Sequence, residues 1–144
     1  MIWVLRHGDA EDEGTDDASR RLTEKGEDQA RAAGQALAAI GAELDACLTS
    51  PKLRAADTAR LACEPLGLAV EQTEMLRGGD VDLDDLAAGR GGVLVVGHEP
   101  DLSRAVQRAT GARVELKKGG LAGIERGVLL ALLRPAEVAK IASD

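Results

Sequence analysis

The sequence has 144 residues, the size of one domain, and we expect residues 1–144 to fold as a single unit. Its 25 acidic and 18 basic residues give a formal net charge of −7. This charge argues against nucleic acid or an anionic membrane as a partner, because both attract a basic face. Two cysteines cannot form a disulfide framework, and no apolar run is long enough for a signal peptide or a membrane span. We therefore expect a soluble cytoplasmic protein.

Apolar runs and helical periodicity alternate along the chain. Strands are predicted at residues 1–5, 45–49, 68–72, 93–96, 120–124 and 128–133, and helices at 23–41, 82–88, 100–109 and 135–142, with a further helix that opens at Ser50-Pro51. Thr23 is the predicted N-cap of the first helix, and Ser50-Pro51 is predicted to open the second. This alternation predicts the α/β class: a single three-layer α/β/α domain with a mostly parallel, mixed sheet. Its core must be built from Leu, Val, Ile and Ala, because the chain has one Trp and neither Phe nor Tyr.

An acidic stretch separates the first strand from the first helix. Residues 9–17 carry six carboxylates in nine positions. A segment of this composition cannot bury itself, so it is predicted to be a solvated loop. The alternative is that it forms an acidic rim that selects partners.

The only two histidines of the chain follow two of the predicted strands, in Arg6-His7-Gly8 and in Gly97-His98. Ligands bind at the carboxyl ends of strands in open α/β sheets, so we expect the two imidazoles to meet there. Arg54, near the start of a helix that also follows a strand, joins them. Arg6 and Arg54 offer planar donor forks for phosphate oxygens, and Gly8 permits a sharp turn and a close approach to a ligand. A neutral His7 can attack phosphorus, while a protonated His98 can donate to the phosphoryl oxygens.

Four motifs occur in a fixed order over nearly the whole chain: Arg6-His7-Gly8, Leu22-Thr23-x-x-Gly26, Ser50-Pro51-x-x-Arg54-Ala55-x-x-Thr58-Ala59 and Gly97-His98-x-Pro100. In these motifs the sequence resembles the histidine phosphatase superfamily, and within it the short SixA-type phosphohistidine phosphatases. The resemblance implies a phosphoglycerate mutase-like fold. It also implies that His7 is the phosphorylated nucleophile and that Arg6, Arg54 and His98 form the phosphate pocket beside Gly8. A reaction that uses neither a metal nor a cofactor is implied as well.

The proton donor is the role that the motifs define least. The family often uses a Glu in a Leu-x-Glu stretch between the Ser-Pro helix and the second histidine. Glu74 matches that location, although Gln72-Thr73 precede it here, and Asp9 is the competing candidate. A phosphohistidine substrate reduces the need for an acid, because a protonated imidazole leaves readily.

The leading hypothesis is a phosphatase that hydrolyses phosphohistidine in a partner protein, for example a histidine-phosphotransfer domain. The spacing from Ser50 to His98 leaves little room for the insertions that roof the pockets of larger superfamily members. The acidic stretch would also repel small polyanions. Three alternatives stay open: a small-molecule phosphomonoesterase acting on sugar phosphates or nucleotides, a non-catalytic phosphoryl-binding module, and a metal site of His7, His98 and a carboxylate.

Overall fold

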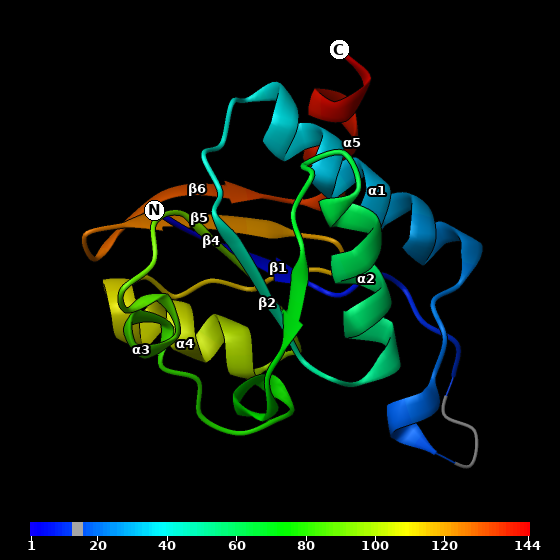
Figure 1. The fold of residues 1–144 in the computed structure, drawn as a ribbon, viewed down its shortest axis with the longest axis horizontal. Helices are drawn as coiled ribbons and strands as arrows, with labels where there is room; N and C mark the ends of the chain where they lie inside the picture. Colours follow the sequence, from blue (N-terminus) through cyan, green and yellow to red (C-terminus); the bar gives the residue numbers. More distant parts are fainter. Residues whose placement is uncertain (13–15) are drawn as a thin grey trace.

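The computed structural model describes residues 1–12 and 16–144, so residues 13–15 of the predicted acidic loop lie outside the described part (Figure 1). The elements follow one another as β1 (Ile2–Arg6), η1 (Asp17–Ser19), α1 (Glu24–Ala39), β2 (Ala46–Thr49), α2 (Leu53–Cys63), β3 (Val70–Gln72), η2 (Glu74–Leu76), α3 (Leu83–Ala87), β4 (Val93–Gly97), α4 (Asp101–Thr110), β5 (Leu121–Glu125), β6 (Val128–Leu133) and α5 (Pro135–Ser143). No helix in these ranges combines the length and apolar character needed to cross a membrane.

The strands form one six-stranded sheet in the order β3-β2-β4-β1-β5-β6. The neighbours from β3 to β1 pair in parallel, whereas β5 runs antiparallel to both β1 and β6. Helices α1, α2 and α5 cover one face of this sheet, and α3 and α4 cover the other (Figure 1). The α/β class, the three layers and the mostly parallel mixed sheet are therefore as predicted.

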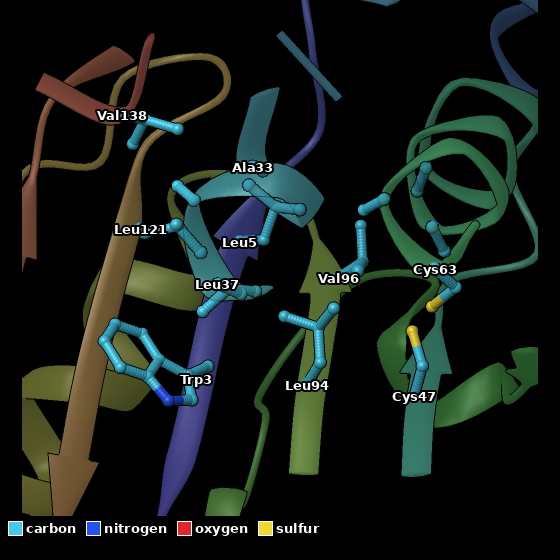
Figure 2. Close-up of a cluster of buried hydrophobic side chains, with 14 residues drawn as sticks. Trp3, Leu5, Ala33, Leu37, Cys47, Cys63, Leu94, Val96, Leu121 and Val138 are labelled. Carbon is cyan, nitrogen blue, oxygen red and sulfur yellow. The ribbon is translucent and has the colours of Figure 1, made fainter. Parts of the chain in front are cut away.

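Aliphatic side chains fill both interfaces between the sheet and the helices. All five residues of β4 are buried, because this central strand is covered on both faces. In the interface with α1 and α2, small residues such as Ala33 let the helices approach the sheet closely, and Trp3 supplies the one large ring (Figure 2). The thiols of Cys47 and Cys63 face each other in the same interface, and both cysteines are free and buried. A core without Phe or Tyr is thus closed by close helix–sheet packing.

Two helix starts show how the predictions fared. Thr23 caps α1 as predicted, since its hydroxyl accepts the Gly26 N–H at 3.1 Å. The prediction for α2 was wrong: regular helix begins at Leu53, and Lys52 holds the N-cap position without a side-chain bond. The Ser50 hydroxyl accepts the Lys52 N–H at 3.2 Å in the bend before the helix, and it also contacts His98.

Candidate active site

The register of the sheet brings the two histidines together. β1 and β4 are parallel neighbours with Arg6 opposite Gly97, so the next residue of each chain segment is a histidine. The His7 N–H continues the ladder by donating to the Gly97 carbonyl at 3.1 Å. The two imidazole centroids lie 5.2 Å apart, and the rings are only 6% and 7% exposed. The two imidazoles therefore lie together at one edge of the sheet, as expected.

A single hydrogen bond defines which nitrogen of His7 is free. His7 Nδ1 lies 2.7 Å from the carbonyl oxygen of Gly8. A carbonyl oxygen can only accept, so Nδ1 must carry the proton and donate. The lone pair of a neutral ring is then on Nε2, the nitrogen that can act as a nucleophile.

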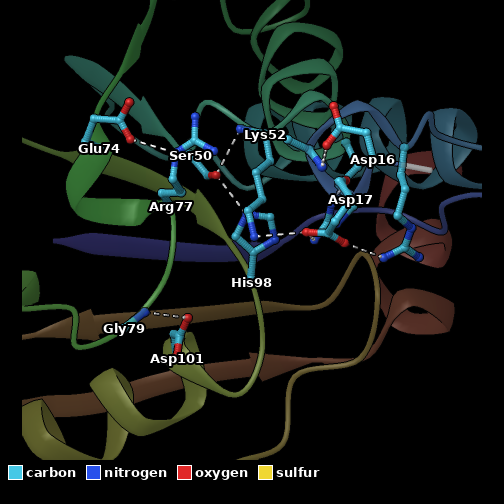
Figure 3. A network of polar contacts seen from close by, with 12 residues as sticks. Asp16, Asp17, Ser50, Lys52, Glu74, Arg77, Gly79, His98 and Asp101 are labelled. Carbon is cyan, nitrogen blue, oxygen red and sulfur yellow. Dashed lines mark hydrogen bonds and ion pairs between the residues drawn. The ribbon is translucent and has the colours of Figure 1, made fainter. Parts of the chain in front are cut away.

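His98 is held by the hydroxyl of Ser50 (Figure 3). His98 Nε2 lies 2.8 Å from Ser50 Oγ, which also accepts the Lys52 N–H at 3.2 Å. Ser50 directly follows β2, and its own N–H donates to Val96 of β4 at 3.1 Å. Sequence reasoning treated this serine only as a helix cap. Its signal was its place in the Ser-Pro motif, but the contact with a residue 48 positions away is set by the sheet.

The two arginines place their guanidinium groups at the same edge. Arg54, on the first turn of α2, is 6% exposed and donates from Nη1 to the Asp17 carbonyl at 2.8 Å. Arg6 donates from Nη1 to the Leu116 carbonyl at 3.0 Å. Arg6 Nε, Arg54 Nε and His98 Nδ1 are buried and have no hydrogen-bond partner among the described residues. Buried polar groups are normally satisfied, so this cluster offers donors to a ligand rich in acceptors, such as a phosphoryl group.

Burial and nearby charge keep both imidazoles neutral. Burial lowers the pKa of His7 to about 4, and the positive charges of Arg54 and Arg6 act in the same direction. The pKa of His98 falls to about 3, first through burial and then through His7 and Arg54. At neutral pH both rings are therefore uncharged. Burial among cations disfavours a further positive charge on His98.

The turn after His7 is fixed from two sides. The Gly8 N–H donates to the Thr58 hydroxyl of α2 at 3.1 Å, and that hydroxyl donates to the Arg54 carbonyl at 2.7 Å. On the other side, a Cβ on Gly8 would lie 2.4 Å from the carbonyl oxygen of Gly26, and one on Gly26 would lie 1.9 Å from that of Asp9. Only glycine fits at either position. The first three sequence motifs thus touch one another at this turn.

The described part of the acidic stretch does more than solvate a loop. Asp17 lies on η1 against the site, where its carboxylate is 3.1 Å from Lys52 Nζ and 3.4 Å from Arg54 Nη2 (Figure 3). The Lys52 hydrogen bond and the neighbouring cations lower the pKa of Asp17 to about 2. Asp17 is exposed to solvent, as predicted, but it lies on the short helix η1 instead of a loop, and two cations at the start of α2 hold its carboxylate. The Glu13, Gly14 and Thr15 part of the prediction lies outside the described residues.

The two candidate proton donors lie in different surroundings. The Asp9 carboxylate accepts the Thr23 hydroxyl at 2.9 Å and pairs with Lys118 at 3.2 Å, and these contacts lower its pKa. A carboxylate held in its charged form is a poor acid. Glu74 opens η2, which is tied to the end of β2 through Thr73, and its side chain is 75% exposed and bonded to Arg77 at 2.8 Å. Glu74 as the donor stays a prediction.

Comparison with known proteins assigns the chain to a class. A family model described as the histidine phosphatase superfamily (branch 1) matches residues 2–86. An uncharacterised protein of Picosynechococcus sp. is 35% identical over 140 residues, covering 88% of this chain and 85% of the relative. The chain belongs to the histidine phosphatase superfamily.

Two further relatives refine the likeness. The chain is similar to the structure of the protein histidine phosphatase SixA complexed with tungstate, with a TM-score of 0.81, 25% identity and coverage of 94% of this chain and 97% of that one. It is also 41% identical over 58 residues to the mitochondrial serine/threonine-protein phosphatase Pgam5 of Drosophila ananassae, covering 40% of this chain and 20% of the relative. The fold is phosphoglycerate mutase-like, the protein's structure resembles SixA-type members of the superfamily, and its activity is that of a phosphatase.

Proposed function

We propose that this phosphatase hydrolyses phosphohistidine in a partner protein through a covalent phosphohistidine intermediate on His7. One observation carries the proposal. The Gly8 carbonyl holds the proton of His7 on Nδ1, and the free Nε2 lies in a buried cluster with donors of Arg6, Arg54 and His98 that lack partners among the described residues. This combination pairs a nucleophile with an array of positive groups for phosphoryl oxygens.

In the first step, His7 Nε2 attacks phosphorus, and the bond from phosphorus to the substrate imidazole breaks. The electron pair of that bond goes to the departing nitrogen, which is protonated by solvent or by Glu74. Arg6, Arg54 and His98 contact the three equatorial oxygens, where charge is spread in the transition state. His98 can serve while neutral: if the Ser50 hydroxyl donates to Nε2, the ring proton is on Nδ1 and points to the phosphoryl group.

In the second step, water attacks the phosphorus of the phosphoenzyme, and the bond to His7 Nε2 breaks. The imidazole recovers its lone pair, the water gives its proton to solvent or to the Glu74 carboxylate, and inorganic phosphate leaves. The guanidinium groups supply the positive charge that a metal ion supplies in other phosphoryl-transfer sites. We therefore propose a reaction that needs no metal, which unchanged activity in excess chelator would support.

A protein-bound substrate suits the carboxylate on one side of the site. Asp17 lies there beside Lys52 and Arg54 and adds negative charge to that side. A phosphohistidine side chain brings one phosphoryl group on a long stem, so it approaches with less repulsion than a bisphosphate or a nucleotide. The printed activity of the structurally similar SixA, a protein histidine phosphatase, agrees with this choice.

A substrate panel tests the proposal. We expect a phosphohistidine-bearing protein domain to be turned over with a higher kcat/KM than phosphoserine peptides, phosphoglycerate, sugar phosphates or nucleotides. Rapid quenching with a ³²P-labelled substrate should trap acid-labile phosphate on His7, and the His7→Ala variant should trap none. A preference for small monoesters would replace the protein substrate by the alternative phosphomonoesterase function. Absence of a phosphoenzyme on wild-type protein during turnover would remove the covalent mechanism.

A further inference from the structure

A cavity lies on the Arg6 side of the candidate active site. It has a volume of about 560 Å³, and its walls include the side chains of Arg6 and Glu99. Arg6 precedes His7 in the chain and Glu99 follows His98, so each histidine has its immediate neighbour in this wall. Arg6 therefore belongs both to the cluster of unpartnered donors around the histidines and to this cavity, which places the cavity within reach of residues that flank the phosphoryl group of a bound protein substrate.

The cavity is rich in cations although the protein is acidic. Its lining includes the basic residues Arg6, Arg104, Arg113 and Lys117 and the acidic residues Glu99 and Glu115. The carboxylate of Glu99 is engaged by the N–H and the hydroxyl of Ser103. Positive charge is therefore in excess here, in a chain whose formal net charge is −7.

Three of these cations are also without a carboxylate partner. Within residues 1–12 and 16–144, ten of the 18 lysines and arginines form ion pairs, and Arg104, Arg113 and Lys117 are among the eight that do not. In a protein with more acidic than basic residues, unpaired cations that gather on one cavity point to an anionic group that comes from outside.

The backbone that carries these cations is anchored. Leu116 is 2% exposed, its N–H donates to the Ser103 hydroxyl at 3.1 Å, and its carbonyl accepts from Arg6 at 3.0 Å. Arg113 and Lys117 flank this fixed point and are themselves exposed, as is Arg104 on α4. Fixed backbone with exposed cationic side chains reduces the ordering cost of binding, because only side-chain freedom is lost.

We infer that this cavity binds acidic side chains next to the phosphohistidine of the protein substrate, and so selects substrates by their flanking sequence. The inference rests on the proposed function, and it adds a recognition site to the reaction site. Asp17, on η1 and packed against α2, is by contrast paired with Arg54. A substrate with acidic residues on one side of its phosphohistidine would therefore be oriented, since the cavity attracts that side.

Matched peptides and charge-matched variants test the inference. Two phosphohistidine peptides are compared, identical except that one carries Glu and the other Gln at the positions flanking the phosphohistidine. We expect the wild-type protein to hydrolyse the Glu peptide with a kcat/KM about fivefold higher, the size expected for a few exposed ion pairs. The variant Arg104→Glu/Arg113→Glu should lose or invert this preference, while its rate on p-nitrophenyl phosphate stays near wild type.

The control variant is Arg31→Glu/Lys140→Glu, which changes net charge equally at exposed positions of α1 and α5. It should keep the preference for the Glu peptide. The preference should also fall when salt is raised from 50 to 500 mM, because exposed charges are screened. An equal preference in the wild type and the cavity variant, or no preference in the wild type, would overturn the inference.

A binding measurement separates failure of this inference from failure of the proposed function. If the wild-type protein hydrolyses neither phosphohistidine peptide but does hydrolyse p-nitrophenyl phosphate, the proposed substrate is wrong. The cavity is then judged by fluorescence anisotropy with a labelled, unphosphorylated Glu peptide. Tighter binding to the wild type than to Arg104→Glu/Arg113→Glu supports an acidic-segment site, and equal binding overturns it.

Discussion

The ends of β1 and β4 present the same side chain at neighbouring positions of one sheet, yet the two histidines are held in different ways. His7 is fixed by a backbone carbonyl, an obligate acceptor, so its proton position is determined. His98 faces the hydroxyl of Ser50, which can both donate and accept. A fixed tautomer suits a nucleophile, whereas an adjustable one suits a group that donates to oxygens whose charge changes. The difference predicts a division of labour between two residues that look alike in the sequence.

The largest effects on activity are expected for His7→Ala and His98→Ala, which test this division of roles. Loss of the nucleophile should lower kcat by about 10³-fold or more and abolish the phosphoenzyme. Loss of a donor to the phosphoryl oxygens should lower kcat by about 10²-fold while labelled phosphoenzyme still forms slowly. Rapid-quench experiments with a labelled substrate measure both quantities.

Circular dichroism and urea unfolding at pH 7.5 serve as the control for these variants, since both replaced rings are buried. A trapped phosphoenzyme in His7→Ala, or equal behaviour of the two variants, would contradict the assigned roles. The control identifies a variant that has lost its fold, and His7→Gln and His98→Gln then replace the alanine variants.

The shared property of the two histidines, their burial, predicts a loss of stability in mild acid. The pKa of each is lowered from about 6.5, to about 4 for His7 and about 3 for His98. As the pH falls below 6.5 the unfolded chain binds protons that the folded chain refuses, so the free energy of unfolding decreases. From pH 7.5 to pH 5 we expect a loss on the order of 2 kcal/mol for each histidine. Urea unfolding at the two pH values measures it.

His98→Gln provides the comparison for this measurement, because it removes one titrating group and keeps a polar side chain of similar size. Its stability should decline less between pH 7.5 and pH 5 than that of the wild type. The carboxylate of Asp17, whose pKa is about 2, stays ionised throughout this range and does not contribute. An equal decline in both proteins would mean that His98 is not held neutral.

The hydrogen bond between Ser50 and His98 can be removed without removing either imidazole. Ser50→Ala leaves His98 Nε2 without its contact at 2.8 Å, and we expect kcat/KM to fall about tenfold as the ring loses its orientation. The ¹⁵N chemical shifts of the His98 ring should change, while those of His7 should stay. Ser143→Ala, on the exposed last turn of α5, is the matched control and should change neither. An unchanged rate would show that the hydroxyl does not position His98.

The sequence was sufficient where local rules decide the structure. The aliphatic run 93–96 predicted the central strand, and Thr23 predicted a helix start, because burial and capping depend on neighbouring residues. The histidines could be placed at one sheet edge because parallel strands end on the same side. The α2 start was predicted wrongly for the converse reason. Ser50 satisfies every local rule for an N-cap, and only the neighbouring β4 gives its hydroxyl another partner.

Long-range contacts also explain why composition did not predict the position of Asp17 in the acidic stretch. Six carboxylates in nine residues indicate solvation, and no local signal distinguishes Asp17 from its neighbours. Its position is set by Lys52 and Arg54, which are 35 and 37 residues away. The cavity beside Arg6 is of the same kind, since residues of β1, α4 and the segment before β5 meet there only in the folded chain.

The smallest effect is expected for Glu74. Its replacement tests whether a group other than the two histidines supplies the proton to the leaving group. Its exposed carboxylate can act as an acid when the leaving group is an alkoxide, which needs protonation. We expect Glu74→Gln to lower kcat on alkyl phosphate monoesters about fivefold and to change the rate on a phosphohistidine peptide by less than about twofold, because imidazole leaves readily once protonated by solvent. The control is Glu71→Gln, which changes a carboxylate on β3 that is paired with Arg90. An unchanged monoester rate would remove Glu74 from the mechanism and leave proton transfer to water.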